Sequence, residues 1–304
     1  MNVLITGGAG FIGSHVVEAF QARGHHVGIL DNYVTGSLQN IPNLYGVEIF
    51  PGDVTNLEQL WEAVLAFQPH VICHLAAQPS LISSIEKTAE DAQANIIGTI
   101  NVCTAAAATG VLAHVILAST SAVYDPRDGI YDETSRTHPI VPYGLSKLTA
   151  ERYLEISNVP WTVLRFGNVY GPRQVPLGEN QLIPKCLSHL LYGTAFTIRG
   201  DGNQSRDFIY VKDIASAHVA VAENKVLGVF NCGTGIGTSV NSVCAHLRNI
   251  VGMEGRFYRD NRVSGEPRHI RLVSDKLMRS AGWIPVTDIE TGLTLTAQSW
   301  RAKR

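Results

Sequence analysis

Three glycines stand at intervals of three residues directly after the first apolar run of the chain. The run covers residues 2–6, and the segment that follows, TGGAGFIGSH, contains Gly7, Gly10 and Gly13. Gly7 permits a tight turn, Gly10 lets the backbone approach a pyrophosphate, and Gly13 lets a helix pack on a strand. The helix N-terminus adds N–H donors and the positive end of its dipole. The spacing predicts a dinucleotide-binding loop.

The first half of the chain alternates short apolar, β-branched runs with helical stretches. Alternation of this kind implies βαβ units and a parallel sheet. The strands are nearly continuous apolar runs, as expected when helices cover both faces of a sheet. The sequence therefore predicts an α/β fold with a doubly wound parallel sheet. The expected strands are 2–6, 26–30, 47–50, 70–75, 114–119 and 161–166, and the expected helices are 11–23, 56–67, 90–109 and 144–157.

The second half of the sequence differs in composition and in the length of its expected elements. Residues 167–185 are rich in Gly and Pro, and shorter elements follow. We expect one domain at 1–166 and a smaller, mixed α/β domain at 167–304, with 209–235 rejoining the first domain. The expected helices here are 180–192, 213–223, 240–251, 275–281 and 288–303.

Composition excludes several classes of protein. The chain is 45% hydrophobic and 16% charged, with a net charge of −2, so it has no electrostatic footprint for nucleic acid or an anionic membrane. Because no apolar run is long enough, we expect no membrane span, and we expect no leader before the first strand. We expect a cytoplasmic protein without a metal site. The five cysteines are predicted to be small buried residues in a reducing compartment: Cys73, Cys103, Cys186, Cys232 and Cys244.

Acidic residues follow the second and third predicted strands. Asp31 ends the run HVGILD, where a carboxylate can accept hydrogen bonds from the adenosine ribose and would repel a 2′-phosphate. This favours NAD over NADP. Asp53, in GDVTN, has two open interpretations. It can bond the adenine amino group, or it can belong to the N-cap region of the helix expected at 56–67.

A tyrosine and a lysine stand one helical turn apart in PYGLSK. Tyr143 and Lys147 are neighbours on a helix surface. An ammonium near a phenol lowers the pKa of the phenol, which would give a general base near neutral pH. The pair alone also fits a coincidence on a solvated helix face.

Eleven segments together resemble a known family. They are TGGAGFIGSH, DNYVTGSLQNI, GDVTN, HLAAQPS, NIIGTINV, STSAVY, YGLSK, LRFGNVYGPR, GDGNQSRDFIYVKDIA, GEPRH and AGW. The chain resembles the extended short-chain dehydrogenase/reductase superfamily, in particular its NAD-dependent nucleotide-sugar epimerase/dehydratase branch, and the pattern is most similar to UDP-glucose 4-epimerase-like enzymes. The resemblance implies an N-terminal Rossmann domain that holds NAD and a smaller domain that binds the nucleotide sugar. It also implies a homodimer through helices 90–109 and 144–157.

The resemblance implies catalytic roles for Tyr143, Lys147 and Thr120. Lys147 would bond the nicotinamide ribose and lower the pKa of Tyr143. Tyr143 would take the proton of a sugar hydroxyl while hydride leaves for NAD. Thr120, in STSAVY, would bond the reacting sugar oxygen. Ser119 and Ser121 flank it, and a turn residue at a strand end is the alternative interpretation.

The resemblance also implies two sets of binding residues. The cofactor set is Gly7, Gly10, Phe11, Ile12, Gly13, Asp31, Asn32, Asp53, Val54, Leu75, Ala76, Ala77, Asn95, Tyr143 and Lys147. The substrate set is Thr120, Asn168, Thr197, Arg206 and Arg268. Guanidinium groups suit phosphate oxygens, but Arg206 can instead form a surface ion pair with Asp207 or Asp201. Arg262 and Arg271 are alternatives to Arg268.

The residues after Thr120 bear on the reaction. Dehydratases of the family have an Asp-Glu pair there, and decarboxylating relatives have a Glu where this chain has Ala122; Ser121 and Ala122 supply no acid. The expected reaction is epimerisation at C4 of a UDP-sugar, through a 4-keto intermediate and hydride return to the opposite face. The alternatives are a decarboxylase, a dehydratase, a reductase or a non-catalytic NAD-binding sensor. Leu272 is a candidate for the position that limits sugar size.

Overall fold

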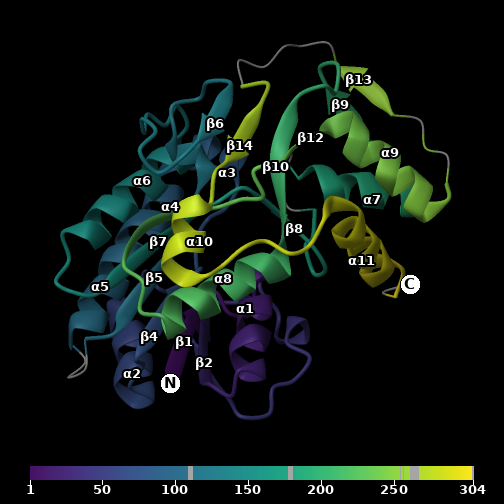
Figure 1. Cartoon of the computed structure of the whole chain (residues 1–304). Coiled ribbons are helices and arrows are strands. Elements are labelled where there is room, and N and C mark those ends of the chain that lie inside the picture. The colour runs from purple at the N-terminus through teal and green to yellow at the C-terminus, as the bar shows by residue number, and fades with distance from the viewer. Residues whose placement is uncertain (109–111, 177–180, 254, 256, 261–266, 303–304) are drawn as a thin grey trace.

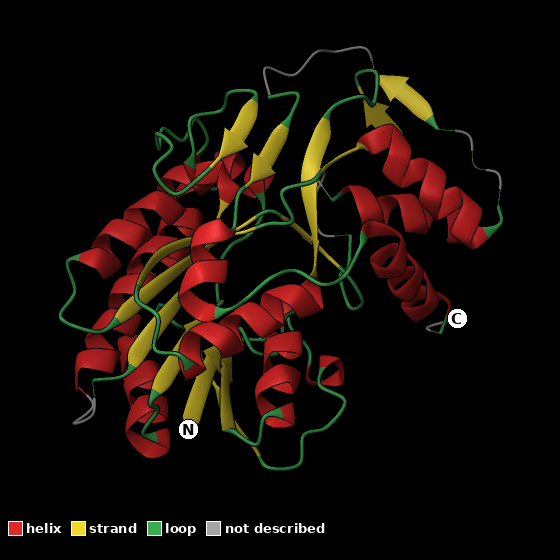
Figure 2. Cartoon of the chain, viewed as in Figure 1, coloured by secondary structure: helices red, strands yellow, loops and turns green. Residues whose placement is uncertain are grey.

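A seven-stranded parallel sheet forms the larger part of the computed structural model (Figures 1 and 2). The structure describes residues 1–108, 112–176, 181–253, 255, 257–260 and 267–302. The strand order is β11-β7-β5-β4-β1-β2-β3. The strands are β1 (Asn2–Thr6), β2 (His26–Asp31), β3 (Val47–Pro51), β4 (Val71–His74), β5 (His114–Thr120), β7 (Trp161–Phe166) and β11 (Gly228–Cys232). All six strands predicted in the first half are confirmed.

Successive residues of each strand point to opposite faces of the sheet, and both faces are buried. Val3 and Ile5 pack in the core beneath one helical layer, while Leu4 packs beneath the other. The first layer contains α1 (Phe11–Ala22) and α8 (Val211–Glu223). The second contains α2 (Leu57–Phe67), α5 (Gly98–Ala108) and α6 (Pro142–Glu155). The predicted doubly wound Rossmann-type fold is confirmed.

The prediction of one uninterrupted helix at 90–109 is wrong, because a π-helical turn divides the segment. The described residues form α4 (Thr88–Ala92), a π-helical turn η2 (Gln93–Ile97) and then α5. Residue 109 lies outside the described residues. The Thr99 hydroxyl donates to the Asn95 carbonyl at 2.7 Å, and the Asn95 side chain enters a buried polar cluster. Single π-turns inside helices often occur at functional sites.

The smaller part of the molecule has its own apolar core. Three helices, α7 (Leu182–Tyr192), α9 (Val240–Val251) and α11 (Ile289–Arg301), pack on β8 (Asn168–Tyr170) and β10 (Ser205–Tyr210). The remaining strands are β6 (Gly129–Tyr131), β9 (Thr197–Arg199), β12 (Gly237–Ser239), β13 (Tyr258–Asp260) and β14 (Ile270–Leu272). The remaining helices are α3 (Leu81–Glu86), α10 (Asp275–Ala281) and the single 3-10 turns η1 (Leu38–Asn40) and η3 (Ser121–Val123).

We keep the division into domains at 1–166 and 167–304 as a proposal. The return of 209–235 to the first domain is supported by two contacts, because α8 covers the large sheet and β11 pairs with β7 in parallel. All five cysteines are buried and free, as predicted. Within the described part of the chain, no helix combines the length and apolarity that a membrane span requires.

Candidate active site

The glycine turn joins β1 to α1 with little space to spare. Gly7 has φ +69°, and a Cβ built on it would lie 2.8 Å from the backbone nitrogen of Ala76. A Cβ on Gly13 would lie 2.1 Å from the Gly7 carbonyl oxygen. Gly10 is the N-cap of α1, and no side chain caps that helix end. The first N–H groups of α1 are therefore available to an anion such as a pyrophosphate.

Asp31 is fixed beside this turn at the end of β2. Its side chain is buried, and its two carboxylate oxygens accept the N–H groups of Ala9 at 2.9 Å and Tyr33 at 2.8 Å. An ionised carboxylate has about four acceptor positions, so two remain for ribose hydroxyls. The expected role of Asp31 fits this geometry and stays a prediction.

Asp53 and Asn32 lie together at the ends of β3 and β2. Asn32 Nδ2 donates to Asp53 Oδ2 at 2.8 Å, and Asp53 Oδ1 accepts the Thr55 N–H at 2.8 Å. The N-cap of α2 is Asn56, whose side chain accepts from Glu58 and Gln59. Asp53 therefore orders the loop before the helix but is not its capping residue.

The other expected cofactor residues surround the turn in different ways. Leu75, Ala76 and Ala77 are half-buried and follow β4, and Ala76 is in contact with the turn. Phe11 and Ile12 pack their side chains against the core of the smaller part, so only their backbone N–H groups are placed to serve phosphates. Val54 is buried, and a Cβ on Gly98 would lie 2.8 Å from its Cγ2, so it supports the helix that follows Asn95.

Tyr143 lies in the first turn of α6, which begins at Pro142. Proline is favoured at this position because its fixed φ suits a helix start and its missing N–H would have no partner. Burial raises the pKa of Tyr143 to about 12, hydrogen bonding with Thr120 at the end of β5 lowers it, and the charge of Asp91 raises it. Ser119 points elsewhere, because its hydroxyl donates to Glu151. The structure therefore brings Thr120, and not Ser119, to Tyr143.

Lys147 lies one turn further along α6 and is 3% exposed. Burial lowers its pKa to about 8, against the charges of Glu151 and Asp91, which raise it. No described residue forms a hydrogen bond with its ammonium group. The predicted lowering of the Tyr143 pKa by Lys147 is wrong for the chain alone, because burial dominates the phenol.

A buried polar cluster connects the π-turn to α6. Asn95 Nδ2 donates to Asp91 Oδ1 at 3.0 Å and to Ser146 Oγ at 3.1 Å, and Asn95 Oδ1 accepts the Gln78 N–H at 3.0 Å. The structure thus places Asn95 against the segment that contains Lys147. Asp91, Gln78 and Ser146 were not identified from the sequence, because no local pattern marks them.

Glu151 and Arg165 form a second buried feature that the sequence analysis missed. Two guanidinium nitrogens of Arg165 contact the two carboxylate oxygens of Glu151, at 3.0 and 2.6 Å, and each side chain is 4% exposed. Glu151 is four residues after Lys147, so the two share a helix face. The four-residue spacing could have linked Glu151 to Lys147, but no local pattern links Glu151 to its partner Arg165 on β7.

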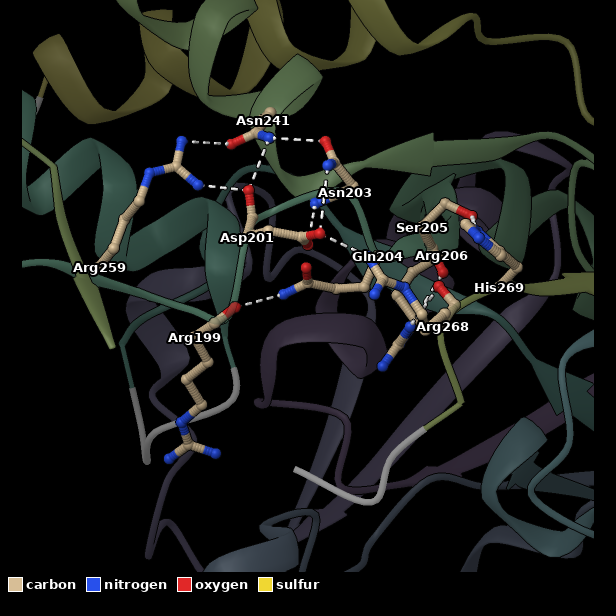
Figure 3. Close-up of polar contacts among 10 residues, drawn as sticks. All are labelled: Arg199, Asp201, Asn203, Gln204, Ser205, Arg206, Asn241, Arg259, Arg268 and His269. Carbon is tan, nitrogen blue, oxygen red and sulfur yellow. Dashed lines mark hydrogen bonds and ion pairs between the residues drawn. The ribbon is translucent and has the colours of Figure 1, made fainter. Parts of the chain in front are cut away.

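The expected substrate residues are only partly brought together. Arg206 and Arg268 lie side by side among ten polar residues at the edge of the smaller part (Figure 3). Arg206 Nη1 donates to the Ser205 carbonyl at 3.0 Å, and Arg268 Nη2 donates to Asp201 at 2.6 Å. Asn168 on β8 and Thr197 on β9 are exposed outside this cluster.

The structure also bears on three residues that the sequence left open, which are Asp207, Leu272 and Arg262. The Asp207 carboxylate accepts N–H groups of Thr234, Gly235 and Leu272, so it is occupied by backbone. Leu272 is fully buried in an apolar cluster with Tyr124 and Tyr131, and its suggested role in limiting sugar size stays a prediction. Arg262, an alternative to Arg268, lies outside the described residues. Among the described residues, no group of three or more His, Cys, Asp and Glu could hold a metal ion.

Comparison with known proteins gives consistent matches over the whole chain. Residues 3–233 match the model of the NAD dependent epimerase/dehydratase family. A putative UDP-glucose 4-epimerase of Methanocaldococcus jannaschii is 36% identical over 96% of this chain and 95% of its own. A structure of UDP-glucose 4-epimerase with UDP-glucose from Thermotoga maritima superposes with a TM-score of 0.92 at 35% identity, covering 100% of this chain and 99% of that one. A structure of a Thermus thermophilus UDP-glucose 4-epimerase in complex with NAD superposes with a TM-score of 0.91 at 34% sequence identity, covering 100% of both chains.

Replacing Gly10 with alanine tests the phosphate cradle without disturbing the fold. A Cβ there meets only the Gly7 carbonyl oxygen, at 3.1 Å, whereas the Cβ of Gly13→Ala overlaps backbone. We expect Gly10→Ala to keep its melting temperature and to bind NAD at least about tenfold more weakly, a change of about 1.4 kcal/mol. Calorimetric titration measures the affinity. Gly13→Ala should lose thermal stability. Unchanged NAD affinity in Gly10→Ala would contradict the cradle.

Replacing Lys147 with methionine should stabilise the NAD-free chain while removing its activity. The lysine titrates at 10.5 in the unfolded chain and at about 8 in the folded one, so the folded state binds fewer protons between these values. The free energy of unfolding therefore rises with pH across that window. Below pH 8 the buried charge costs on the order of 1–3 kcal/mol, which Lys147→Met should recover at pH 7 and not at pH 10.5.

The measurement is urea unfolding of both proteins at a series of pH values. Lys276→Met is the control, because Lys276 is not part of this site. Its ammonium group donates to the Val229 carbonyl at 2.8 Å. A Lys147→Met variant that is less stable than wild type at pH 7 would show that the ammonium is well compensated inside the chain.

Proposed function

The chain belongs to the NAD dependent epimerase/dehydratase family, and we propose that it is an enzyme that interconverts the two C4 epimers of a UDP-sugar. The observation that supports this most strongly is the meeting of Tyr143, Thr120 and Lys147 at one edge of the sheet. Thr120 ends β5, and both other residues lie in the first two turns of α6. The glycine turn after β1 opens at the same edge, since the strands are parallel.

NAD is the cofactor, and the residues present fit it. The uncapped N-terminus of α1 suits the pyrophosphate, the carboxylate of Asp31 suits the adenosine ribose, and the Lys147 ammonium, which bonds no described residue, suits the nicotinamide ribose. When bound, NAD accepts a hydride from C4 and later returns it. A Cβ on Gly7 would overlap the Ala76 backbone and a Cβ on Gly13 would overlap the Gly7 carbonyl, so the turn requires glycine at both positions.

Tyr143 is the proposed base and acid of the reaction. Its phenolate takes the proton of the C4 hydroxyl as hydride leaves the same carbon, which gives a 4-keto sugar. After the ketone presents its other face, the phenol returns the proton to the oxygen while hydride returns to carbon. Thr120 bonds the reacting oxygen, and Lys147 supplies a fixed positive charge. The raised pKa of Tyr143 suits its role as the acid in the return step.

Ser121 and Ala122 favour epimerisation over the other reactions of the family. They form the 3-10 turn directly after Thr120 and carry no carboxyl group. Water loss from the 4-keto sugar needs a group that protonates the leaving hydroxyl, and neither residue can do so. A net reductase would release its oxidised cofactor, whereas an epimerase regenerates it in each cycle.

The arginine cluster supports a nucleoside diphosphate as the handle of the substrate. In Figure 3, Arg259 and Arg268 bond Asp201, and Arg206 lies beside Arg268. The guanidinium group of Arg199 points away from Asp201. Guanidinium groups bind phosphate oxygens with two parallel hydrogen bonds, so Arg206 and Arg268 are the proposed diphosphate ligands. The Thermotoga maritima relative holds UDP-glucose, which makes a UDP-sugar the first substrate to test. Asn168 and Thr197, which are exposed outside the arginine cluster, remain proposed substrate contacts.

The product assay tests the proposal directly. The purified chain is incubated with NAD and, separately, UDP-glucose, UDP-N-acetylglucosamine and UDP-glucuronate, and the products are identified by NMR. We expect the C4 epimer of one of them. Tyr143→Phe should lower kcat by about 10²–10⁴-fold with unchanged UDP affinity. Tyr153→Phe, on the exposed face of the same helix, is the control.

Each other product points to a different function. Carbon dioxide from UDP-glucuronate would indicate a decarboxylase, and a 6-deoxy sugar would indicate a dehydratase. Stoichiometric NADH release would indicate net oxidation of the sugar, because an epimerase returns the hydride in each cycle. Tight NAD binding with no conversion of any sugar nucleotide would contradict an enzyme and support a sensor.

We also propose that the chain forms a homodimer through the helices at 90–109 and 144–157. Apolar side chains on or next to them are exposed by 38–76%: Ile97, Leu145, Tyr153 and Ile156. Burying such side chains is favourable by about 25 cal/mol per Å² of apolar area. Light scattering should give twice the mass of one chain, and Leu145→Asp combined with Tyr153→Asp should give one. A monomeric wild-type chain would exclude the dimer.

A further inference from the structure

The turn that begins at Thr120 is in contact with one buried ion pair on both of its sides. Glu151 on α6 and Arg165 on β7 form this pair through hydrogen bonds of 3.0 and 2.6 Å. Ser119, the residue before Thr120, donates its hydroxyl to Glu151. Tyr124, the residue after the turn η3, lies under the Arg165 guanidinium, whose Cζ is 4.9 Å from the centre of the Tyr124 ring. The acid therefore holds one flank of the turn and the base holds the other.

The register of the large sheet explains why one carboxylate reaches two strands. Ser119 on β5 and Arg165 on β7 are paired residues of neighbouring parallel strands, so their side chains leave the sheet on the same face. Leu117 and Val163, two residues earlier on each strand, pack in the core beneath α6. Glu151 lies above this face and bridges both strands. It is 4% exposed, and its two partners are each 3% exposed.

The first turn of α6 lies directly on the turn after Thr120. A Cβ on Gly144 would lie 2.4 Å from the Ala122 carbonyl oxygen, so only glycine permits this approach of the two backbones. Gly144 follows Tyr143 in the chain, and the Ala122 N–H donates to the Thr120 hydroxyl at 3.2 Å. The separation of the Tyr143 phenol and the Thr120 hydroxyl therefore depends on how α6 is seated on the end of β5.

We propose that Glu151 and Arg165 are positioning residues of the active site, whose ion pair seats α6 on the end of β5 and so brings the Thr120 hydroxyl to the Tyr143 phenol. The effect on the reaction rests on the function proposed above, whereas the restraint on the turn does not. The desolvation of two buried charges offsets most of their attraction, so such a pair contributes little net stability. Its hydrogen bonds are directional, and two parallel bonds fix one geometry.

Replacing both charges with apolar side chains separates positioning from stability. Glu151→Met combined with Arg165→Met leaves no lone buried charge, so we expect a melting temperature close to that of wild type. Because a small misplacement of reacting groups is costly, kcat should fall about 10–10²-fold, with unchanged KM for the UDP-sugar and unchanged NAD affinity. A stable double variant with the kcat of wild type would overturn the proposal.

Thr162→Val is the matched control. Its hydroxyl bonds the His114 ring at 2.8 Å at the other end of the same two strands, where the site has no residues. We expect this variant to be less stable than wild type and to keep its kcat. A loss of kcat in Thr162→Val as large as in the double variant would mean that any buried polar contact of these strands matters equally, which contradicts a specific role of the ion pair.

Ser119→Ala removes one hydrogen bond and no charge, so it decides the question even where the double variant does not fold. We expect kcat to be about tenfold lower than in wild type. In the Thr120→Ala background the same change should cause no further loss, because Ser119 acts through Thr120. Equal losses in both backgrounds would show that Ser119 does not act through its neighbour, and the proposal would fail.

Hydrogen exchange of the full chain with NAD measures the restraint without any sugar nucleotide. The Ala122 N–H donates to the Thr120 hydroxyl and the Tyr124 N–H to the Ser121 carbonyl, so both report on the turn. We expect both to exchange at least about tenfold faster in Ser119→Ala and at the wild-type rate in Thr162→Val. Unchanged exchange in Ser119→Ala would refute the restraint whatever the enzyme converts. Faster exchange in a chain that converts no sugar nucleotide would defeat the proposed function alone.

Discussion

The parallel arrangement of seven strands, buried on both faces, is the constraint on which the site depends. Because the strands run the same way, all their carboxyl ends meet at one edge of the sheet. The strand order changes direction at β1, which lies between β2 and β4, so the connections leaving β1 and β4 run to opposite faces. The glycine turn, Asp31, Ala76 and Thr120 follow four different strands and still lie along this one edge. Ligands of doubly wound sheets bind at such a point.

Sequence reasoning succeeded where the chemistry is local. The interval of three between glycines and the turn between Tyr143 and Lys147 are properties of a few consecutive residues. The alternation of strands and helices also follows from short periodicities, because burial on both faces leaves a continuous apolar run. These features predicted the large sheet and the helix that contains Lys147, although that helix begins at Pro142 and not at residue 144.

What the sequence did not show depends on residues far apart in the chain. Asn95 is 51 positions from its partner Ser146, and Arg165 is 14 from its partner Glu151, so no local spacing pairs them. The π-turn contains Asn95, whose side chain reaches Ser146 on another helix. Without NAD, burial raises the pKa of Tyr143, and an argument from a charged neighbour alone does not include this larger influence. These features share one cause, which is tertiary packing.

The arginines of the smaller part are located by backbone pairing more than by their own charges. Arg206 directly precedes Asp207 on β10, and the Asp207 carboxylate accepts the N–H of Leu272 on β14 at 3.0 Å. The Ser205 N–H also donates to the Arg268 carbonyl at 2.7 Å, so the two segments run side by side.

In this arrangement the backbone of the arginines is fixed, whereas their guanidinium groups can change bonding partners. Asp207 is fully buried and bonded to three backbone N–H groups, so it acts as a fixed link between β10, the turn at Thr234 and β14. Arg268, by contrast, is exposed and bonded to the exposed carboxylate of Asp201. Exposed ion pairs contribute little, about 0–1 kcal/mol, so the Arg268 guanidinium can exchange Asp201 for a phosphate at small cost while its backbone stays in place. A rigid backbone with side chains free to change partners is what recognition of a diphosphate requires.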